Sequence, residues 1–264
     1  MTTTTNHRTT PRPDATVSAL PFTQQVRAEL RRTASSRSGR WLLTAAGAVL
    51  LAVLAVQLST ADPEDLAFRD FVQASATPLS LLLPLLGILA ATTRWKQRTS
   101  STTSALEPTS VRVVLAQLAA LVAISLLAVV AALTAAAVAN VAGATLLDGS
   151  GAWTLAPSAV GDLLLTPLLA VVQGFAFGLL LLSTAGAIVL YYLLTPLWGV
   201  VLTLVDSLEN AAPWLDLGTA VGQLSEGSAS AQHVAQLASA ATLWVLLPLA
   251  LGLLRLKRGE VTPG

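Results

Sequence analysis

Long apolar stretches alternate with short polar segments along most of this chain. Six of the stretches contain no charged residue, and each has close to the 20 or so residues that an α-helix needs to cross a bilayer. An isolated strand in lipid would leave its peptide groups without hydrogen bonds, so helices are expected. The pattern predicts an all-α membrane protein with six transmembrane helices, at Trp41–Leu58, Ser75–Thr93, Val113–Val138, Leu163–Leu182, Ala185–Val205 and Gln236–Leu254.

The charges between the apolar stretches are sorted by side. If successive connections alternate across the membrane, one side holds the N-terminal forty residues, the 94–112 connection, the 183–184 turn and the C-terminal tail. That side carries 14 of the 15 lysines and arginines, all except Arg69, whereas ten of the 14 acidic residues lie opposite. Because cytoplasmic connections retain Lys and Arg, we expect both termini in the cytoplasm and a multi-pass protein of the inner (plasma) membrane.

Composition narrows the possible functions. Hydrophobic residues make up 54% of the chain and charged residues 11%, against about 25% charged in soluble domains. The longest polar connection, Asp206–Ala235, is too short for an ordinary soluble domain, and we expect it to be an outward-facing loop with room for a short amphipathic helix. The chain has no cysteine, no P-loop, no HExxH or GxSxG motif and no ionisable residue in the middle of a span. We therefore expect no enzymatic activity, cofactor or metal site, and secondary transport is disfavoured.

The N-terminal region divides in two. Residues 1–16 are polar and rich in Thr and Pro, which predicts a disordered tail. Over 17–40, Phe22, Val26 and Leu30 recur every four residues among arginines, which predicts an amphipathic helix in the cytoplasmic headgroup layer. A solvated basic linker is the alternative. The transmembrane domain would then cover 41–256, with a cytoplasmic tail at 257–264.

Two further segments carry recognisable patterns. Thr93–Gln117 (TRWKQRTSSTTSALEPTSVRVVLAQ) is basic and contains Trp95 and Glu107, which favours a docking surface, although topology alone explains basic residues there. Gly174 and Gly178 form a GxxxG pair, with Gly186 eight residues on, and such small residues permit close helix approach. We favour packing within the chain over a dimer contact for these glycines.

Three segments resemble bacterial ABC-2 type permeases of the actinobacterial multidrug or lantibiotic export kind. Arg98-Thr99, Leu106-x-Pro108 and Arg112 stand where that family has R-T, L-x-P and an Arg between its second and third spans. VVQGFAFGLLLLSTAGAIVLYYLL is similar to the family's hairpin between the fourth and fifth spans, and ATLWVLLPLALGLLRLKRGEV is similar to its last span.

The resemblance implies a permease subunit without catalytic residues. Two six-span halves would pair as a homodimer or heterodimer, each bound to a separate cytoplasmic ATPase whose closure drives export. The partners would be that ATPase, the second half and membrane lipids, with no nucleic acid. The 17–40 helix would be the connecting helix, and the coupling residues would be Trp95, Arg98, Glu107 and Arg112.

The chain departs from the family at three positions. Arg94 replaces an acid at the end of the second span, Gln117 replaces a Lys, and Leu182 replaces an Arg. These departures lead to the hypothesis of one unequal half of a heteromeric permease. A non-transporting scaffold that anchors a cytoplasmic partner is the alternative function. An apolar pathway lined by a few hydroxyls is compatible with amphipathic drugs, lipids and peptides alike, so the sequence does not identify the substrate.

Overall fold

The chain folds as a bundle of helices. The computed structural model describes residues 21–63, 66–100, 111–226 and 230–261, and the regular elements in these ranges are all helical. Six of the described helical segments are long and apolar enough to cross a membrane. The predicted all-α, six-span fold is therefore confirmed, and the chain is a multi-pass membrane protein.

The helices follow one another with short connections. In chain order they are α1 (Phe22–Ser35), α2 (Arg37–Thr60), α3 (Phe68–Ser100), α4 (Val111–Leu146), α5 (Pro157–Leu181), α6 (Thr184–Leu204), a 3₁₀ helix (Asp206–Ala211), α7 (Ala212–Leu215), α8 (Leu217–Glu226), α9 (Ala231–Ala241), a π-helical turn (Thr242–Leu246) and α10 (Leu247–Val261).

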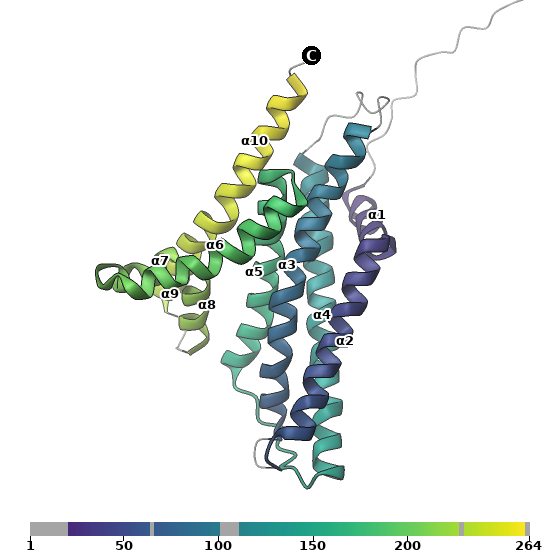
Figure 1. Cartoon of the computed structure of the whole chain (residues 1–264), viewed down its shortest axis with the longest axis vertical. Coiled ribbons are helices and arrows are strands. Elements are labelled where there is room, and N and C mark those ends of the chain that lie inside the picture. Colours follow the sequence, from purple (N-terminus) through teal and green to yellow (C-terminus); the bar gives the residue numbers. More distant parts are fainter. Residues whose placement is uncertain (1–20, 64–65, 101–110, 227–229, 262–264) are drawn as a thin grey trace, which may run out of the picture.

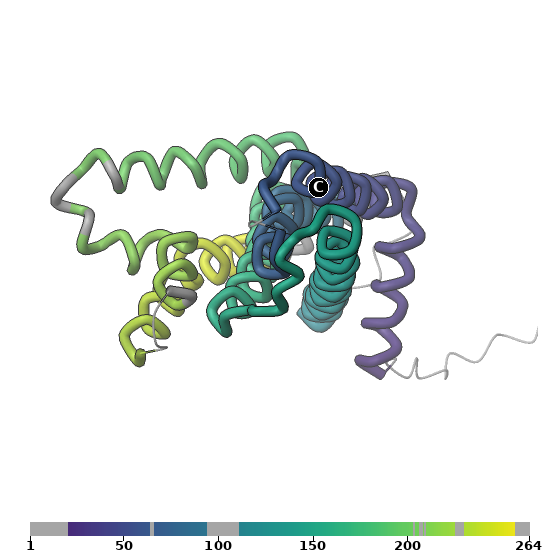
Figure 2. The backbone as a smooth tube through the Cα atoms, turned by 90° about the horizontal axis from the view of Figure 1, so that it is seen from below, coloured from purple at the N-terminus to yellow at the C-terminus, as the bar shows by residue number. Residues whose placement is uncertain are grey.

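The pair α3 and α5 forms the centre of the bundle, with α2 and α4 on one side and α6 and α10 on the other (Figures 1 and 2).

Glycines bring α3 and α5 into backbone contact. A Cβ placed on Gly87 would lie 2.2 Å from the carbonyl oxygen of Val171, and one on Gly174 would lie 2.3 Å from the carbonyl oxygen of Pro84. Only glycine allows the two backbones to approach so closely. We call this contact, made by Gly87, Gly174 and Gly178, the glycine seam. Large side chains that are at most 2% exposed fill the core around it, among them Phe71, Leu83, Leu86, Val171 and Phe175.

A second, aromatic cluster joins α5, α6, α8 and the π-helical turn. Phe177 lies 6.1 Å from Tyr191 and 6.3 Å from Trp244, measured between ring centroids. The indole N–H groups of Trp198 and Trp244 both donate to the carbonyl oxygen of Leu215, at 3.3 and 2.7 Å. One backbone oxygen at the end of α7 thus connects α6 to the last span.

Most of the segment Asp206–Ala235 is helical, which is more than the loop with one short amphipathic helix that we expected. Asp216 caps α8 by accepting from the backbone N–H of Thr219 at 2.7 Å, and Ser230 caps α9 by accepting from that of His233. Leu217 and Ala220 of α8 are buried in the aromatic cluster, and this burial outweighs the polar composition that suggested a loop. The last span consequently begins at Ala231.

Five of the six spans are longer than predicted, and two helices continue well beyond the expected ends of their spans. The third extends to Leu146 as part of the 36-residue helix α4, because the Ala-rich sequence after Val138 has a high helix propensity. The second continues beyond Thr93 to Ser100 as α3. With a rise of 1.5 Å per residue, α4 is about 54 Å long and exceeds the roughly 30 Å of hydrocarbon.

Several segments that are far apart in the sequence meet at one end of the bundle, which we call the basic end. It comprises α1, the end of α3, the start of α4, the α5–α6 turn and the end of α10 (Figure 1). The connections between α2 and α3 and between α4 and α5 lie at the other end. The predicted alternation of the connections agrees with this arrangement; the cytoplasmic location of the basic end stays a prediction.

Candidate functional site at the basic end of the bundle

Two threonines join α3 to the α5–α6 turn. Their hydroxyl oxygens lie 2.8 Å apart, and Thr92 also donates to the carbonyl oxygen of Ile88 at 2.9 Å. Because a hydroxyl has a single proton, Thr184 must be the donor to Thr92. Thr92 is fully buried and lies immediately before the segment expected to contact the ATPase. A displacement of the end of α3 would therefore be passed directly to the start of α6.

An arginine joins α10 to the end of α5. The guanidinium of Arg255 donates from one nitrogen to the carbonyl oxygens of Leu180 and Leu181, at 2.8 and 3.4 Å. These carbonyls belong to the last turn of α5, where no further residue of the helix can supply a donor. One turn earlier in α10, a Cβ on Gly252 would lie 2.9 Å from the carbonyl carbon of Leu179, so the two helices are in backbone contact.

The turn between α5 and α6 consists of two residues. Leu182 has a left-handed backbone (φ 53°, ψ 18°), and Ser183 caps α6 by accepting from the N–H of Gly186. A left-handed conformation is unfavourable for a residue with a Cβ, which makes Leu182 a strained position in the most constrained turn of the site. Leu182 is thus the central residue of this turn.

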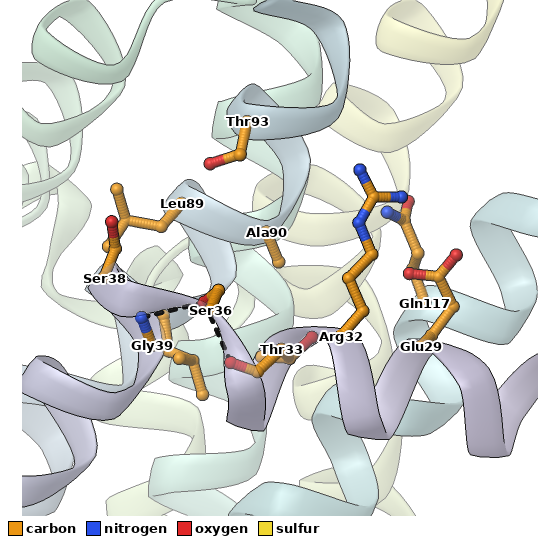
Figure 3. A pocket seen from close by; sticks show the side chains of 11 residues that line it. Glu29, Arg32, Thr33, Ser36, Ser38, Gly39, Leu89, Ala90, Thr93 and Gln117 are labelled. Atoms are coloured by element: carbon orange, nitrogen blue, oxygen red, sulfur yellow. Dashed lines mark hydrogen bonds between the residues drawn. The ribbon is translucent and has the colours of Figure 1, made fainter. Parts of the chain in front are cut away.

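A small cavity of about 70 Å³ separates α1 from α3 and α4 (Figure 3). The residues that line it include Glu29 and Arg32 of α1 and Gln117 of α4. Ser36 fixes the elbow between α1 and α2, because its hydroxyl donates to the carbonyl of Thr33 and accepts from the N–H of Gly39, both at 3.0 Å. A Cβ on Gly39 would lie 2.1 Å from the Thr33 oxygen, so the elbow leaves no space for another side chain.

Three of the four predicted coupling residues, Trp95, Arg98 and Arg112, lie on helices. Trp95 and Arg98 lie in the last two turns of α3, although their side chains are outside the described part of the structure. Arg112 is exposed in the first turn of α4, and Glu107 lies outside the described residues. The expectation of a loop beginning at Arg94 is wrong because the helix continues to Ser100.

The predicted amphipathic helix forms as α1, and part of its apolar stripe packs against the bundle. Leu30 packs against the main core, Val26 is partly buried and Phe22 is 40% exposed, so the apolar stripe of α1 turns inward towards Leu30. The helix ends at Ser35, and α2 begins four residues before the expected boundary, at Arg37.

Two of the three predicted packing glycines contact another helix. Gly174 and Gly178 contact α3 of the same chain, whereas Gly186 lies apart from them in the first turn of α6.

A second, larger hollow opens at the opposite end of the bundle. It has a volume of about 450 Å³ and is lined mainly by the first turns of α3 and α5. Arg69 pairs with Asp70 there at 3.2 Å, and Thr166 donates to Asp162 at 2.7 Å. Between this hollow and the cavity at the basic end lie the backbone contacts of the glycine seam and the buried side chains of the core around it.

Sequence reasoning missed Thr92, Thr184 and Arg255 as functional candidates. Arg255 was treated only as one of many cytoplasmic charges, and threonines are common in membrane helices. The available signal was that each lies inside or directly beside one of the three segments that resemble permeases. Comparisons with models of protein families, with curated proteins and with solved structures find no match to this chain.

We expect the two threonines of the site to be energetically coupled. Thr92→Val and Thr184→Val should each lower the free energy of unfolding by about 1 kcal/mol or more, because each removes the hydrogen bond between the two hydroxyls. Thr92→Val also removes the bond to the carbonyl of Ile88 within α3. The double variant should therefore be less destabilised than the sum of the single variants, with a coupling energy of about 0.5–1 kcal/mol. Thermal unfolding in detergent measures this cycle. Thr134→Val serves as a control, because the Thr134 hydroxyl bonds only within α4; additive losses for Thr92 and Thr184 would contradict the assignment.

Proposed function

We propose that this chain is the permease subunit of an ATP-binding cassette exporter in the plasma membrane, and that it works with a separate cytoplasmic ATPase. The observation that carries the proposal is the meeting of three segments at the basic end. These are the three that resemble ABC-2 type permeases, and hydrogen bonds from Thr184 and Arg255 connect them. An ATPase that pushes on the end of α3 would act on α5, α6 and α10 together.

Because the interior of the bundle is packed with side chains, we place the substrate pathway outside the single bundle. α3 and α5 would have to separate along the glycine seam to open a channel between them, and this would expose core residues such as Phe175 and Val171. By contrast, α2 and α6 are largely exposed. In the most apolar part of each of these two spans, only 11% is buried within the chain. We place the substrate path along such an outer face, closed by a second permease half.

The helix α6 is the best candidate for that face. It slants away from the bundle from the α5–α6 turn (Figure 1), and its apolar side chains are strongly exposed, including Val189, Leu193 and Leu197 at 51–60%. Its first residue, Thr184, is bonded to the end of α3, so a movement of α3 in the ATPase cycle would act directly on α6. The identity of the second half, the same chain or a different one, is decided by crosslinking in native membranes.

The first test is co-purification of an ATP-binding protein with the tagged chain from gently solubilised membranes. We expect an ATPase to be recovered, and Arg98→Ala and Glu107→Ala to reduce its recovery at least fivefold. Arg69→Ala is the matched control, since it removes an exposed arginine at the opposite end of the bundle. Recovery of an ATPase that depends equally on Arg69 would contradict the coupling assignment.

A chain that purifies without any ATPase under several mild conditions would lose the energy source for export. The alternative of a non-transporting membrane scaffold would then account for the basic end, with some other cytoplasmic protein as its partner. Transport of a fluorescent amphipathic drug into inside-out vesicles, dependent on ATP, separates the two functions where an ATPase is present.

A further inference from the structure

Five arginines and a single acid occur between Pro21 and Trp41. The acid, Glu29, and one arginine, Arg32, line the cavity between α1 and the bundle. The other four arginines are exposed, and none of them forms an ion pair within the described residues: Arg27, Arg31, Arg37 and Arg40. This positive surface therefore lacks a counter-charge from the part of the chain that the structure describes.

The elbow at Ser36 and Gly39 holds these arginines in one arrangement. Arg27 and Arg31 lie four residues apart, on the flank of α1 away from the cavity-lining positions, and Arg37 and Arg40 belong to the first turn of α2. Helix α1 runs crosswise to the long axis of the bundle, because it is seen nearly end-on in Figure 1 and side-on in Figure 2. The four arginines thus belong to the crosswise helix α1 and to the turn of α2 that directly follows it, at the base of the first span.

An exposed tryptophan indicates what lies at that level. Trp41 follows Arg40 directly and is 71% exposed, and the apolar positions of α2 beyond it, such as Val49 and Leu51, are exposed as well. Tryptophan prefers the boundary between headgroups and acyl chains, and an exposed Val or Leu in a span faces lipid. The arginines immediately before Trp41 are therefore at the depth of the phosphate groups, where they have favourable access to phosphate oxygens.

From this arrangement we infer that α1 and the first turn of α2 form a binding surface for anionic phospholipids. Arg27, Arg31, Arg37 and Arg40 contact the phosphate and the anionic headgroup, while Trp41 packs against the glycerol and upper acyl region. A soluble acidic protein would leave Trp41 and the adjoining apolar positions of α2 uncovered, whereas a lipid covers both the charged and the apolar parts. The inference stands independently of the ATPase, because none of these residues belongs to the predicted coupling set.

Native mass spectrometry of the purified full chain, without any ATPase, tests the inference directly. The probes are dioleoylphosphatidylglycerol and dioleoylphosphatidylcholine, which differ only in the headgroup. We expect the wild-type chain to bind phosphatidylglycerol at least tenfold more strongly. Each arginine replaced in Arg37→Gln/Arg40→Gln should lower that affinity by about fivefold, since a basic side chain near an anionic surface contributes about this factor. Binding of phosphatidylcholine should be unchanged.

Two control variants separate the contributions. Arg69→Gln, at the opposite end of the bundle, should leave the preference for phosphatidylglycerol intact. Trp41→Ala should weaken both lipids by a similar factor, because the indole contacts parts that the two lipids share.

Three results would overturn the inference. The first is equal affinity of the wild-type chain for the two lipids, a result that does not depend on whether any variant folds. The second is a loss in Arg69→Gln as large as in Arg37→Gln/Arg40→Gln. The third is displacement of phosphatidylglycerol by an equal concentration of glycerol phosphate, which would identify a site for a free phosphate anion in place of a lipid surface.

Discussion

Gly174→Ala is expected to lower the melting temperature of the detergent-solubilised chain by about 10 °C. The new Cβ would lie 2.3 Å from the carbonyl oxygen of Pro84 and 2.9 Å from two further backbone atoms of that residue. Since no flexible side chain can yield, α3 and α5 must separate, and the core around Phe175 must loosen with them. Overpacking of this kind destabilises by about 3 kcal/mol, and 1 kcal/mol corresponds to roughly 2–4 °C in a protein of this size.

Other glycines of the chain provide matched controls for this prediction. A Cβ on Gly47 of α2 or on Gly199 of α6 would meet no heavy atom within 4 Å. Alanine is favoured over glycine in a helix by about 1 kcal/mol, so Gly47→Ala and Gly199→Ala should leave the melting temperature unchanged or raise it slightly. The prediction therefore concerns the sign as well as the size of the change. Similar melting temperatures for all three variants would contradict the packing along the glycine seam.

Trp244→Ala is expected to have the second large effect, a loss of about 3–5 kcal/mol in the free energy of unfolding. Trp244 is 8% exposed, contacts the rings of Phe177 and Trp198, and donates to the carbonyl of Leu215. Its removal would leave a cavity where α5, α6 and the last span meet. Trp244→Phe should cost much less, because the ring is retained and Trp198 still donates to the same carbonyl.

Thermal unfolding followed by tryptophan fluorescence measures both variants of Trp244. Trp214→Ala is the control, since Trp214 lies close by in α7 but is 39% exposed. We expect it to shift the melting temperature by less than a third of the shift in Trp244→Ala. Equal shifts would mean that the aromatic cluster does not hold the last span in place.

The sequence predicted the fold class well because the apolar pattern is repeated six times and because a membrane allows few structures for such stretches. Six uncharged stretches of spanning length have few alternatives in a membrane, and the positions of the spans follow from composition alone. The ends of the helices were harder to predict. Helix α4 continues past Val138 although Asn140 and Gly143 follow, and α3 continues through Trp95 and Arg98 although charges begin there. Hydropathy indicates which part of a helix lies within the hydrocarbon. It does not indicate where the helix itself ends, because backbone hydrogen bonds can continue into the polar segments.

The candidate site was predictable only in part. Resemblance directed attention to the segments that contain Thr92, Thr184 and Arg255, but no pattern in one sequence indicates that a threonine at 92 bonds to one at 184. The helices α7 and α8 were missed for a related reason. Their stability depends on Leu217 and Ala220 being buried against α5 and Trp244, and such contacts appear only when distant segments are brought together.

The glycine seam also sets the order in which the chain can assemble as it is made. Gly87 and its partner Val171 are separated by 84 residues, so the first three spans enter the bilayer before the contact can form. At roughly 5–20 residues per second, the ribosome leaves α3 without its main neighbour for on the order of ten seconds. During that interval Gly87 and Pro84 face lipid or the insertion machinery. A nascent chain stalled before Val171 should accordingly be more sensitive to membrane proteases than one released only a few tens of residues later.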